Sequence, residues 1–191
     1  MNLEFIKDIG GFETFCYQNC QRIILQMRKF KYPELHINAV LSLVFEGGTG
    51  KINTISGVRS LLPSMEQYSH RLSYGPEYSS VDILNLNKQY LDERKEPFIA
   101  GIDSYYLPYT TNYMLNHARH TLVVCDIDKD NKNVDVIDWY PPWFFRGKVA
   151  MKDFLLGRSS ENPYDGTIFS GGSIDNNWAY IDEFTEREPR E

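Results

Sequence analysis

The chain has 191 residues, of which 42% are hydrophobic and 24% charged, and its net charge is −6. This length suits one globular domain that buries roughly two-thirds of its unfolded-chain surface, and the composition excludes disordered, collagen-like and coiled-coil chains. The acidic balance argues against nucleic-acid binding, because neutralising phosphates needs a basic face. The strongest basic group is interpreted as a solvated helix face and comprises Arg22, Arg28, Lys29 and Lys31.

No segment suggests export or membrane insertion. No apolar run approaches the ~20 residues of a spanning helix, and the start MNLEFIKDIGGFETF lacks the basic and apolar regions of a signal peptide. Cys16, Cys20 and Cys125 cannot all pair within one chain, and a Cys16–Cys20 disulfide is not expected one helical turn apart. We therefore expect free thiols, a cytoplasmic location and no membrane partner.

The first half of the chain is predicted to be mainly helical. Apolar residues recur at helical spacing in its longest segments, Thr14 is a suitable N-cap, and Gly47 is a suitable stop for the second helix. The predicted elements are a helix over 15–30, a more apolar helix over 34–46, a short helix within 54–66, a loop or short strand over 67–79, and a helix over 80–95 capped by Ser79 or Ser80.

The second half is predicted to be mainly β-structure. Its elements are a β-rich segment over 97–107, strands over 120–127 and 133–140 joined by a polar turn, a helix over 150–158, and a Gly/Asn/Ser-rich stretch over 159–182 with apolar islands. Helices followed by antiparallel strands predict an α+β fold. We expect one domain over 1–184 and a disordered tail over 185–191.

Three segments imitate ligand-binding motifs without completing them. EGGTGKIN resembles a phosphate-binding loop, but Phe45 and Ile52 stand where that motif needs Gly and Ser or Thr. DIDKDNKNVDVI imitates a calcium loop without its central Gly and final Glu, so a solvated hairpin turn is the better interpretation. His117 and His120 point to opposite faces of an extended segment and could share a metal only if the preceding segment were helical. We therefore predict no metal site.

Cys16 falls in the first turn of the first predicted helix. Free backbone N–H groups and the helix dipole favour a thiolate there, and the Cys16 N–H could also stabilise an oxyanion. Cys20, one turn later on the same apolar face, is expected to be buried and inert. The alternative is that both cysteines are simply small core residues.

His120 opens one predicted strand and Asp138 closes the next. If paired residue numbers add to 258 or 260, the two residues are opposite or diagonal neighbours on one face, with Cα atoms about 5–8 Å apart; an odd sum would separate them. Asp138 follows apolar positions and needs a partner, which an imidazole N–H supplies. The acid would then fix the tautomer that takes a proton from Cys16. Alternatively, Asp138 caps the turn that follows and His120 merely begins a strand.

Three segments resemble the N-terminal domain of the butirosin biosynthesis protein H family: FCYQNCQRIILQ, GIDSYYLPY and HARHTLVVCDIDKDNKNVDVIDWYPP. That family is related to the bacteriocin-processing peptidases. A Cys at the start of the first long helix, followed by strands bearing His and then Asp or Asn, is the layout of papain-like cysteine enzymes. The resemblance runs from about Phe12 to about Ser160. The specific feature is a combination, in which the run D-x-Y-x-L-P-Y is followed by His and then by strand–Asp–strand–Asp. That run comprises Asp103, Tyr105, Leu107, Pro108 and Tyr109.

The resemblance implies a papain-like α+β fold and acyl transfer through a cysteine thioester. The acyl group would come from the phosphopantetheine of an acyl or peptidyl carrier protein and pass to an amine of a small molecule or peptide, in antibiotic or peptide biosynthesis, with no cofactor held by the enzyme. By position, Cys16 is the nucleophile, His120 the general base and acid, and Asp138 the orienting carboxylate. Asp103 and Tyr105 match a family strand that lines the site.

The chain departs from papain-like peptidases before the nucleophile. Those enzymes place a Gln there as an oxyanion donor, whereas this chain has Gly10 and Gly11. Gln18 and the Cys16 N–H are the substitutes we consider. The basic group defined above would be needed to dock an acidic carrier protein. Alternative functions are a peptidase, amidase or thioesterase of the same fold, or a non-catalytic binding module.

Overall fold

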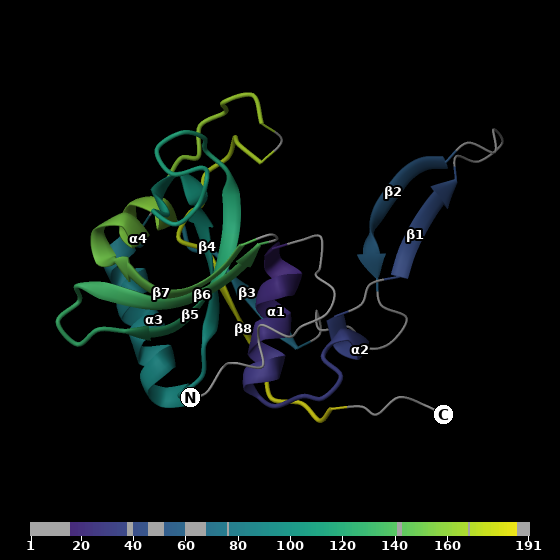
Figure 1. Ribbon diagram of the computed structural model, residues 1–191, viewed down its shortest axis with the longest axis horizontal. Helices are drawn as coiled ribbons and strands as arrows, with labels where there is room; N and C mark the ends of the chain where they lie inside the picture. Colours follow the sequence, from purple (N-terminus) through teal and green to yellow (C-terminus); the bar gives the residue numbers. More distant parts are fainter. Residues whose placement is uncertain are drawn as a thin grey trace.

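The computed structural model describes residues 16–37, 40–45, 52–59, 68–75, 77–140, 143–167 and 169–186. These residues form an α+β structure with a six-stranded antiparallel sheet in the order β3-β8-β4-β5-β6-β7 and a separate antiparallel pair, β1-β2 (Figure 1). The helices are α1 (Cys16–Met27), α2 (Glu34–Ile37), α3 (Ser80–Arg94), α4 (Met151–Arg158) and the 3₁₀ turn η3 (Ser104–Tyr106). The strands are β1 (Val40–Phe45), β2 (Ile52–Arg59), β3 (Ser69–Leu72), β4 (Phe98–Asp103), β5 (Arg119–Ile127), β6 (Asn133–Tyr140), β7 (Trp143–Ala150) and β8 (Trp178–Ile181).

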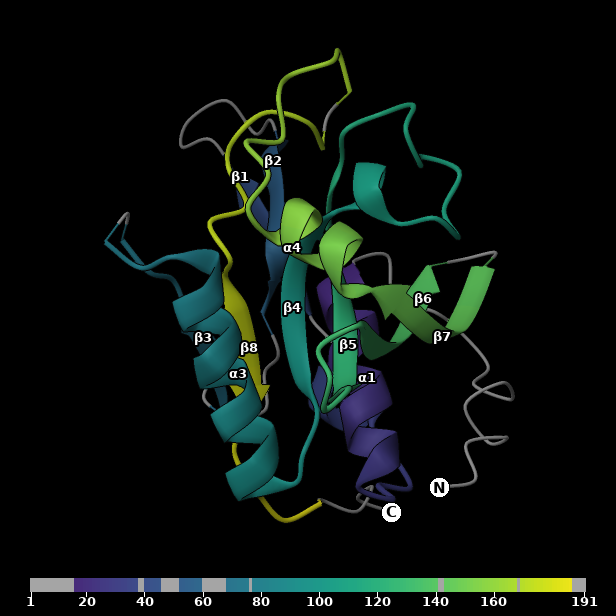
Figure 2. The same cartoon turned by 90° about the vertical axis from the view of Figure 1, so that its left-hand side faces the viewer.

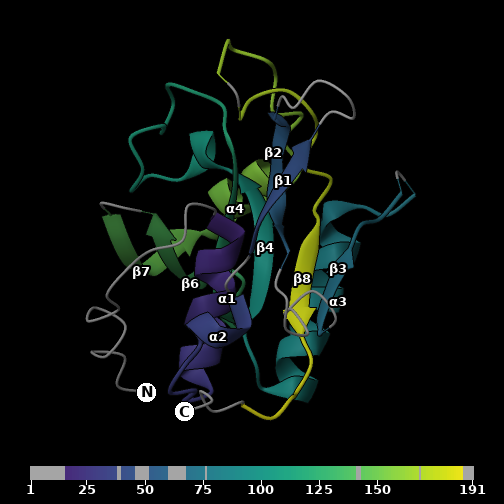
Figure 3. The same ribbon diagram turned by 90° about the vertical axis from the view of Figure 1, so that its right-hand side faces the viewer.

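The six-stranded sheet lies between two layers of helix. Figure 2 shows α3 and α4 on one face, and Figure 3 shows α1 on the other. Successive side chains of β5 alternate between the two faces, as a pleated strand requires. Leu122 packs in the core with Ile83 of α3 and Phe154 of α4, whereas Val123 packs with Ile23 of α1. Two apolar cores therefore hold the ends of β5 and β6 in place.

The hairpin of β5 and β6 has one of the two registers that the sequence analysis required. Val123 pairs with Ile137, so the paired residue numbers add to 260. An irregularity between Val124 and Asp126 shifts the pairing nearer the turn. On the other side of β5, Ile102 of β4 pairs with His120. The prediction of a hairpin with His120 and Asp138 on one face is confirmed.

Several predicted elements are confirmed. Helices were predicted over 15–30, 80–95 and 150–158 and correspond to α1, α3 and α4. Ser79 caps α3: its hydroxyl accepts from the Asp82 N–H, and the Asp82 carboxylate accepts from the Ser79 N–H in a capping box. The proposed N-cap Thr14, the stop at Gly47 and the glycines before Cys16 lie outside the described residues.

The helix predicted over 34–46 is wrong. Of the described residues in this span, Glu34–Ile37 are helical and Val40–Phe45 form strand β1. The predicted helix within 54–66 is also wrong over its described part, because Ile52–Arg59 is strand β2 and pairs with β1. Short apolar runs do not distinguish a buried helix from a strand, and the glycine-rich sequence between these runs is typical of a hairpin connection.

Strand β7 was not predicted, although its aromatic sequence WFFRGKVA has high strand propensity. The tail over 185–191 was expected to be disordered. Within it, the Glu186 carboxylate accepts a hydrogen bond from the Tyr32 N–H, and residues 187–191 lie outside the described part. None of the described helices combines the length and apolar character needed to cross a membrane.

Candidate active site

Cys16 is the first residue of α1, and its side chain is half-buried against β5. Its sulfur is hydrogen-bonded with His120 and Thr121. Burial alone would raise the pKa of the thiol, but the hydrogen bond and charge of His120, together with the contacts of Thr121, outweigh burial and lower the pKa below its usual value of 9.0. This site therefore favours a thiolate.

His120 and Asp138 are buried beside Cys16, with 9% and 3% of their surfaces exposed. Nε2 of His120 lies 2.9 Å from Oδ1 and 2.8 Å from Oδ2 of Asp138. Burial disfavours the imidazolium, but the Asp138 carboxylate and then Cys16 more than compensate and raise the pKa of His120 well above 6.5. Because Asp138 engages Nε2, Nδ1 is the ring nitrogen left to face Cys16. The directions of both pKa shifts favour a thiolate–imidazolium pair.

Tyr109 completes the environment of the carboxylate. Its hydroxyl donates a 2.8 Å hydrogen bond to Oδ2 of Asp138, and its ring stacks on Phe145 at 3.7 Å between centroids. Burial and then the Asp138 charge raise the pKa of Tyr109 well above 10.0, so the hydroxyl remains a donor. The Asp138 carboxylate thus has hydrogen-bond partners on both sides, as a buried carboxylate requires.

Thr121 connects the two thiols of α1. The Cys20 thiol donates to Thr121 Oγ1 at 3.7 Å, and the Thr121 side chain also contacts the Cys16 sulfur. Cys20 is buried as predicted, at 1% exposure. Burial, followed by the charges of Cys16 and Asp138, raises the pKa of the Cys20 thiol well above 9.0. Cys20 therefore stays protonated and donates, while Cys16 carries the reactive sulfur.

The three central residues open into a cleft of about 860 Å³. Gly101 lies in its wall, and a Cβ there would come within 2.1 Å of Oδ1 of Asn177. The glycine therefore lets the Asn177 amide approach the sheet inside the cleft. A cleft of this size can accommodate a small organic substrate.

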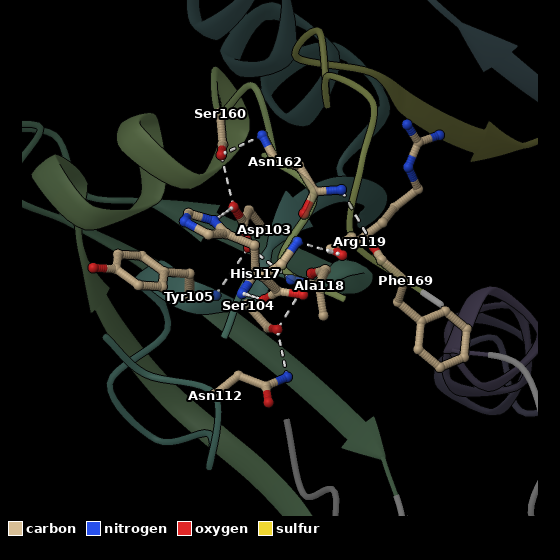
Figure 4. Close-up of polar contacts among 12 residues, drawn as sticks. Asp103, Ser104, Tyr105, Asn112, His117, Ala118, Arg119, Ser160, Asn162 and Phe169 are labelled. Atoms are coloured by element: carbon tan, nitrogen blue, oxygen red, sulfur yellow. Dashed lines mark hydrogen bonds and ion pairs between the residues drawn. The ribbon is translucent and has the colours of Figure 1, made fainter. Parts of the chain in front are cut away.

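Asp103 is fully buried at the end of β4 and accepts four hydrogen bonds (Figure 4). Oδ1 accepts from the N–H groups of Tyr105 and Ala118, both at 3.1 Å. Oδ2 lies 2.6 Å from Nδ1 of His117 and accepts from the Ser160 hydroxyl at 2.6 Å. The carboxylate thus joins η3, the segment before β5 and the segment after α4 to the end of β4.

The Asp103 network reaches the cleft through His117 and Ala118, which line it, whereas Asp103 itself lies behind them. Tyr105 stacks on His117, with ring centroids 4.2 Å apart, and neither Asp103 nor Tyr105 is among the described residues that line the cleft. The network fixes the chain just before His120, so its contribution is positional. Asp103 and Tyr105 thus lie beside the site and are not among the described residues that line the cleft.

The structure brings together Cys16, His120 and Asp138, the three residues chosen as catalytic. Gln18 is half-buried on α1 and is not among the described cleft-lining residues, so the geometry gives no support for its role as an oxyanion donor. The contact of Tyr109 with Asp138 was not predicted, although Tyr109 lies in the D-x-Y-x-L-P-Y run of the family resemblance. Sequence reasoning also missed Thr121, whose only signal was its position next to His120.

The basic group predicted as a solvated helix face is wrong for two of its members. Arg22 is buried at 5% exposure, and Arg28 is ion-paired with Glu96 and donates to the carbonyls of Asp182 and Ile181. Arg22 is therefore covered and Arg28 is committed to these contacts, so neither side chain is available to a docking partner.

The two histidines considered as a metal pair belong to separate networks. His117 pairs with Asp103, and His120 pairs with Asp138. Across the described ranges, no three His, Cys, Asp or Glu side chains gather in a way that could hold a metal ion. Asp128, from the calcium-like segment, pairs instead with Lys148.

No protein-family model matches the chain, and no curated protein matches it either. The resemblance to the butirosin biosynthesis protein H family therefore stays a prediction.

Proposed function

We propose that the protein is a cysteine acyltransferase that moves an acyl group from a carrier-protein thioester to an amine through an acyl-cysteine intermediate. The observation that carries the proposal is the hydrogen-bonded series Cys16–His120–Asp138, in which the thiol pKa is lowered and the imidazole pKa raised. Such a pair is the usual means of activating a thiol for nucleophilic attack. The resemblance to the butirosin biosynthesis protein H family supports the same chemistry.

In the first half-reaction, the Cys16 thiolate attacks the carbonyl carbon of the donor thioester. The carbonyl oxygen becomes an oxyanion, and the Cys16 N–H at the start of α1 is suited to stabilise it. As the tetrahedral intermediate collapses, the C–S bond to the donor thiol breaks. His120 gives its Nδ1 proton to that leaving thiolate, and the acyl group remains on Cys16.

In the second half-reaction, the neutral His120 takes a proton from the incoming amine as the amine attacks the Cys16 thioester. Collapse of this intermediate forms the amide and releases the Cys16 thiolate, so the pair regains its starting charges. Asp138 keeps the ring oriented and stabilises its charged form throughout. If water attacks instead of the amine, the same residues perform hydrolysis.

The test is to incubate the protein with butyryl-pantetheine and to locate any butyryl mass increase by peptide mass spectrometry. We expect the adduct on Cys16, its loss in Cys16→Ala, and its retention in Cys125→Ser. An adduct on Cys20 or Cys125 alone, or none at all, would refute the proposal. Adding an amine separates transfer from hydrolysis, because only transfer gives an amide product.

Two alternatives make different predictions in the same assay. A peptidase or amidase would cleave peptide amides without needing a pantetheine thioester. In a non-catalytic binding module, iodoacetamide would alkylate Cys16 no faster than an ordinary exposed thiol. The biological activity of such a module would survive Cys16→Ala.

A further inference from the structure

We propose that Arg71 binds an anionic group of the substrate, a carboxylate or a phosphate, beside the Cys16 sulfur. Arg71 lies on β3, and its guanidinium carbon is 4.2 Å from the centroid of the Tyr17 ring. Tyr17 directly follows Cys16 on α1, and all three residues line the cleft. The stack therefore places a fixed positive charge next to the nucleophile.

The Arg71 guanidinium has no hydrogen-bonded or ion-paired partner among the described residues; its recorded contact is the Tyr17 ring. Two other arginines are committed differently. Arg28 is paired with Glu96, and Arg119 donates to the carbonyls of Gly172 and Ser173. Arg71 therefore keeps its five N–H donors for a ligand.

The stack on Tyr17 also orders the guanidinium before a ligand arrives. Aromatic stacking of arginine leaves the edge of its planar fork open for a bidentate contact with a carboxylate or phosphate. A side chain already held in place loses less conformational entropy on binding than a mobile one. This arrangement suits recognition better than a freely moving surface cation would.

The charge of the cleft is opposite to that of the whole chain. The protein carries a net charge of −6, yet Arg71 and Arg119 both line the cleft. Among the described residues that line the cleft, Asp138 is the one acidic residue. Its carboxylate is buried and is hydrogen-bonded with His120 and Tyr109. An anionic group is therefore attracted to this cleft.

The anionic group can belong to the acyl chain, as a carboxylate, or to the arm that carries the thioester, as a phosphate. The identity of this substrate rests on the proposed acyl transfer. The binding of an anion beside Cys16 does not depend on acyl transfer, because any reagent that reaches the sulfur experiences the charge of Arg71.

The first experiment compares alkylation of Cys16 by iodoacetate, which is anionic, and by iodoacetamide, which is neutral and similar in size. We expect Arg71→Gln to lower the iodoacetate-to-iodoacetamide rate ratio by about five- to tenfold relative to the wild type. Arg71→Lys keeps the charge and loses the planar fork, so its rate ratio should lie between those of the wild type and Arg71→Gln. The matched control is Arg94→Gln on α3, an exposed arginine outside the described cleft lining, which should leave the ratio unchanged.

Because His120 is retained in every variant, its own charge contributes equally and cancels from the comparison. An unchanged ratio in Arg71→Gln would overturn the anion site. Thermal melting of each variant checks that Arg71→Gln is folded, and exposure of the side chain leads us to expect that it is.

The second experiment identifies the source of the anion. Rates of Cys16 acylation are compared for succinyl- and butyryl-pantetheine, and for butyryl-phosphopantetheine and butyryl-pantetheine. The anionic member of one pair should react faster in the wild type and lose that advantage in Arg71→Gln. If neither anionic member has an Arg71-dependent advantage while thioesters do react, the substrate assignment is overturned. If no thioester reacts but the alkylation ratio still depends on Arg71, the anion site stands and the proposed acyl transfer fails.

Discussion

Nε2 of His120 faces both carboxylate oxygens of Asp138, at 2.9 and 2.8 Å, from the neighbouring strand of one hairpin. The register that adds to 260 makes the two residues diagonal neighbours on one face of the sheet. A two-oxygen contact holds the imidazole plane more firmly than a single hydrogen bond would. The sheet itself therefore sets the direction in which His120 presents its other nitrogen to Cys16.

The pH dependence of Cys16 alkylation tests the thiolate–imidazolium pair. His120 and Thr121 lower the Cys16 pKa below 9.0 against the effect of burial, so the wild type should keep reacting with iodoacetamide at neutral pH. His120→Gln removes the opposing charge and leaves burial, so the pKa should rise and the rate at neutral pH should fall at least about tenfold. The variant's rate should approach that of the wild type only at alkaline pH. Identical pH profiles for the two proteins would contradict the pair.

Replacing Asp138 tests the orienting carboxylate. Asp138→Asn removes the charge that raises the His120 pKa, so the imidazolium form is lost at a lower pH than in the wild type. We expect Cys16 acylation to slow by about 10²–10⁴-fold. The matched variant Tyr109→Phe keeps the carboxylate and removes one 2.8 Å hydrogen bond to it, so about a tenfold loss or less is expected. An Asp138→Asn effect no larger than that of Tyr109→Phe would argue against the role of Asp138.

The three residues proposed as catalytic could be selected from the sequence because each needs a distinctive local setting. A carboxylate on an apolar strand face is costly to bury unless it has a partner. A cysteine at a helix start is favoured as a reactive thiolate. The hairpin between His120 and Asp138 is short, so few registers were available. Thr121 and Tyr109 could not be found this way, because a hydroxyl is acceptable in many positions and its role depends on contacts between distant elements.

The fold was least predictable where short apolar runs carry no periodic signal. Val40–Phe45 and Ile52–Arg59 are strands, but their apolar runs also fit a buried helix, and only their pairing with each other decides the matter. The role of Asp103 was hidden for a related reason. Its four partners lie in segments up to 57 residues away, and strand propensity says nothing about such contacts.

Thr121 tests whether the second hydroxyl contact activates the nucleophile. Thr121→Val keeps the shape and removes the hydroxyl that contacts Cys16 and accepts from Cys20. We expect the Cys16 pKa to rise and iodoacetamide alkylation at neutral pH to slow severalfold. Thr121→Ser keeps the hydroxyl and should restore most of the rate. If valine and serine behaved alike, the hydroxyl would have no part in thiolate stabilisation.

The capping box of α3 gives a pH-dependent stability effect away from the site. Hydrogen bonds from the Ser79 side chain and backbone lower the pKa of Asp82 below its usual 3.8. Because the pKa of Asp82 is lower in the folded than in the unfolded state, its ionised carboxylate stabilises the fold at pH values above its usual pKa. This contribution disappears as the pH falls through the folded-state pKa. Ser79→Ala should cost about 1 kcal/mol in urea unfolding at neutral pH and weaken this acid dependence. An unchanged free energy of unfolding would show that the cap does not stabilise α3.

Asp103 should matter more for stability than for chemistry. Asp103→Ala leaves the buried N–H of Ala118 and the Ser160 hydroxyl without their acceptor, so we expect the free energy of unfolding to fall by about 3 kcal/mol or more. Asp92→Ala, on the exposed side of α3 and paired only at 3.7 Å with exposed Lys95, is the matched control and should stay within about 0.5 kcal/mol of the wild type.

The same variants separate a positional role from a catalytic one. Asp103→Asn keeps an acceptor oxygen and should fold at low temperature, where its Cys16 acylation should be slowed far less than that of Asp138→Asn. The reason is that Asp103 touches the chain ahead of His120, whereas Asp138 touches the imidazole itself. If the rate of Cys16 acylation fell equally in folded Asp103→Asn and Asp138→Asn, Asp103 would have a direct part in the chemistry. That result would contradict a positioning role for the Asp103–His117 pair.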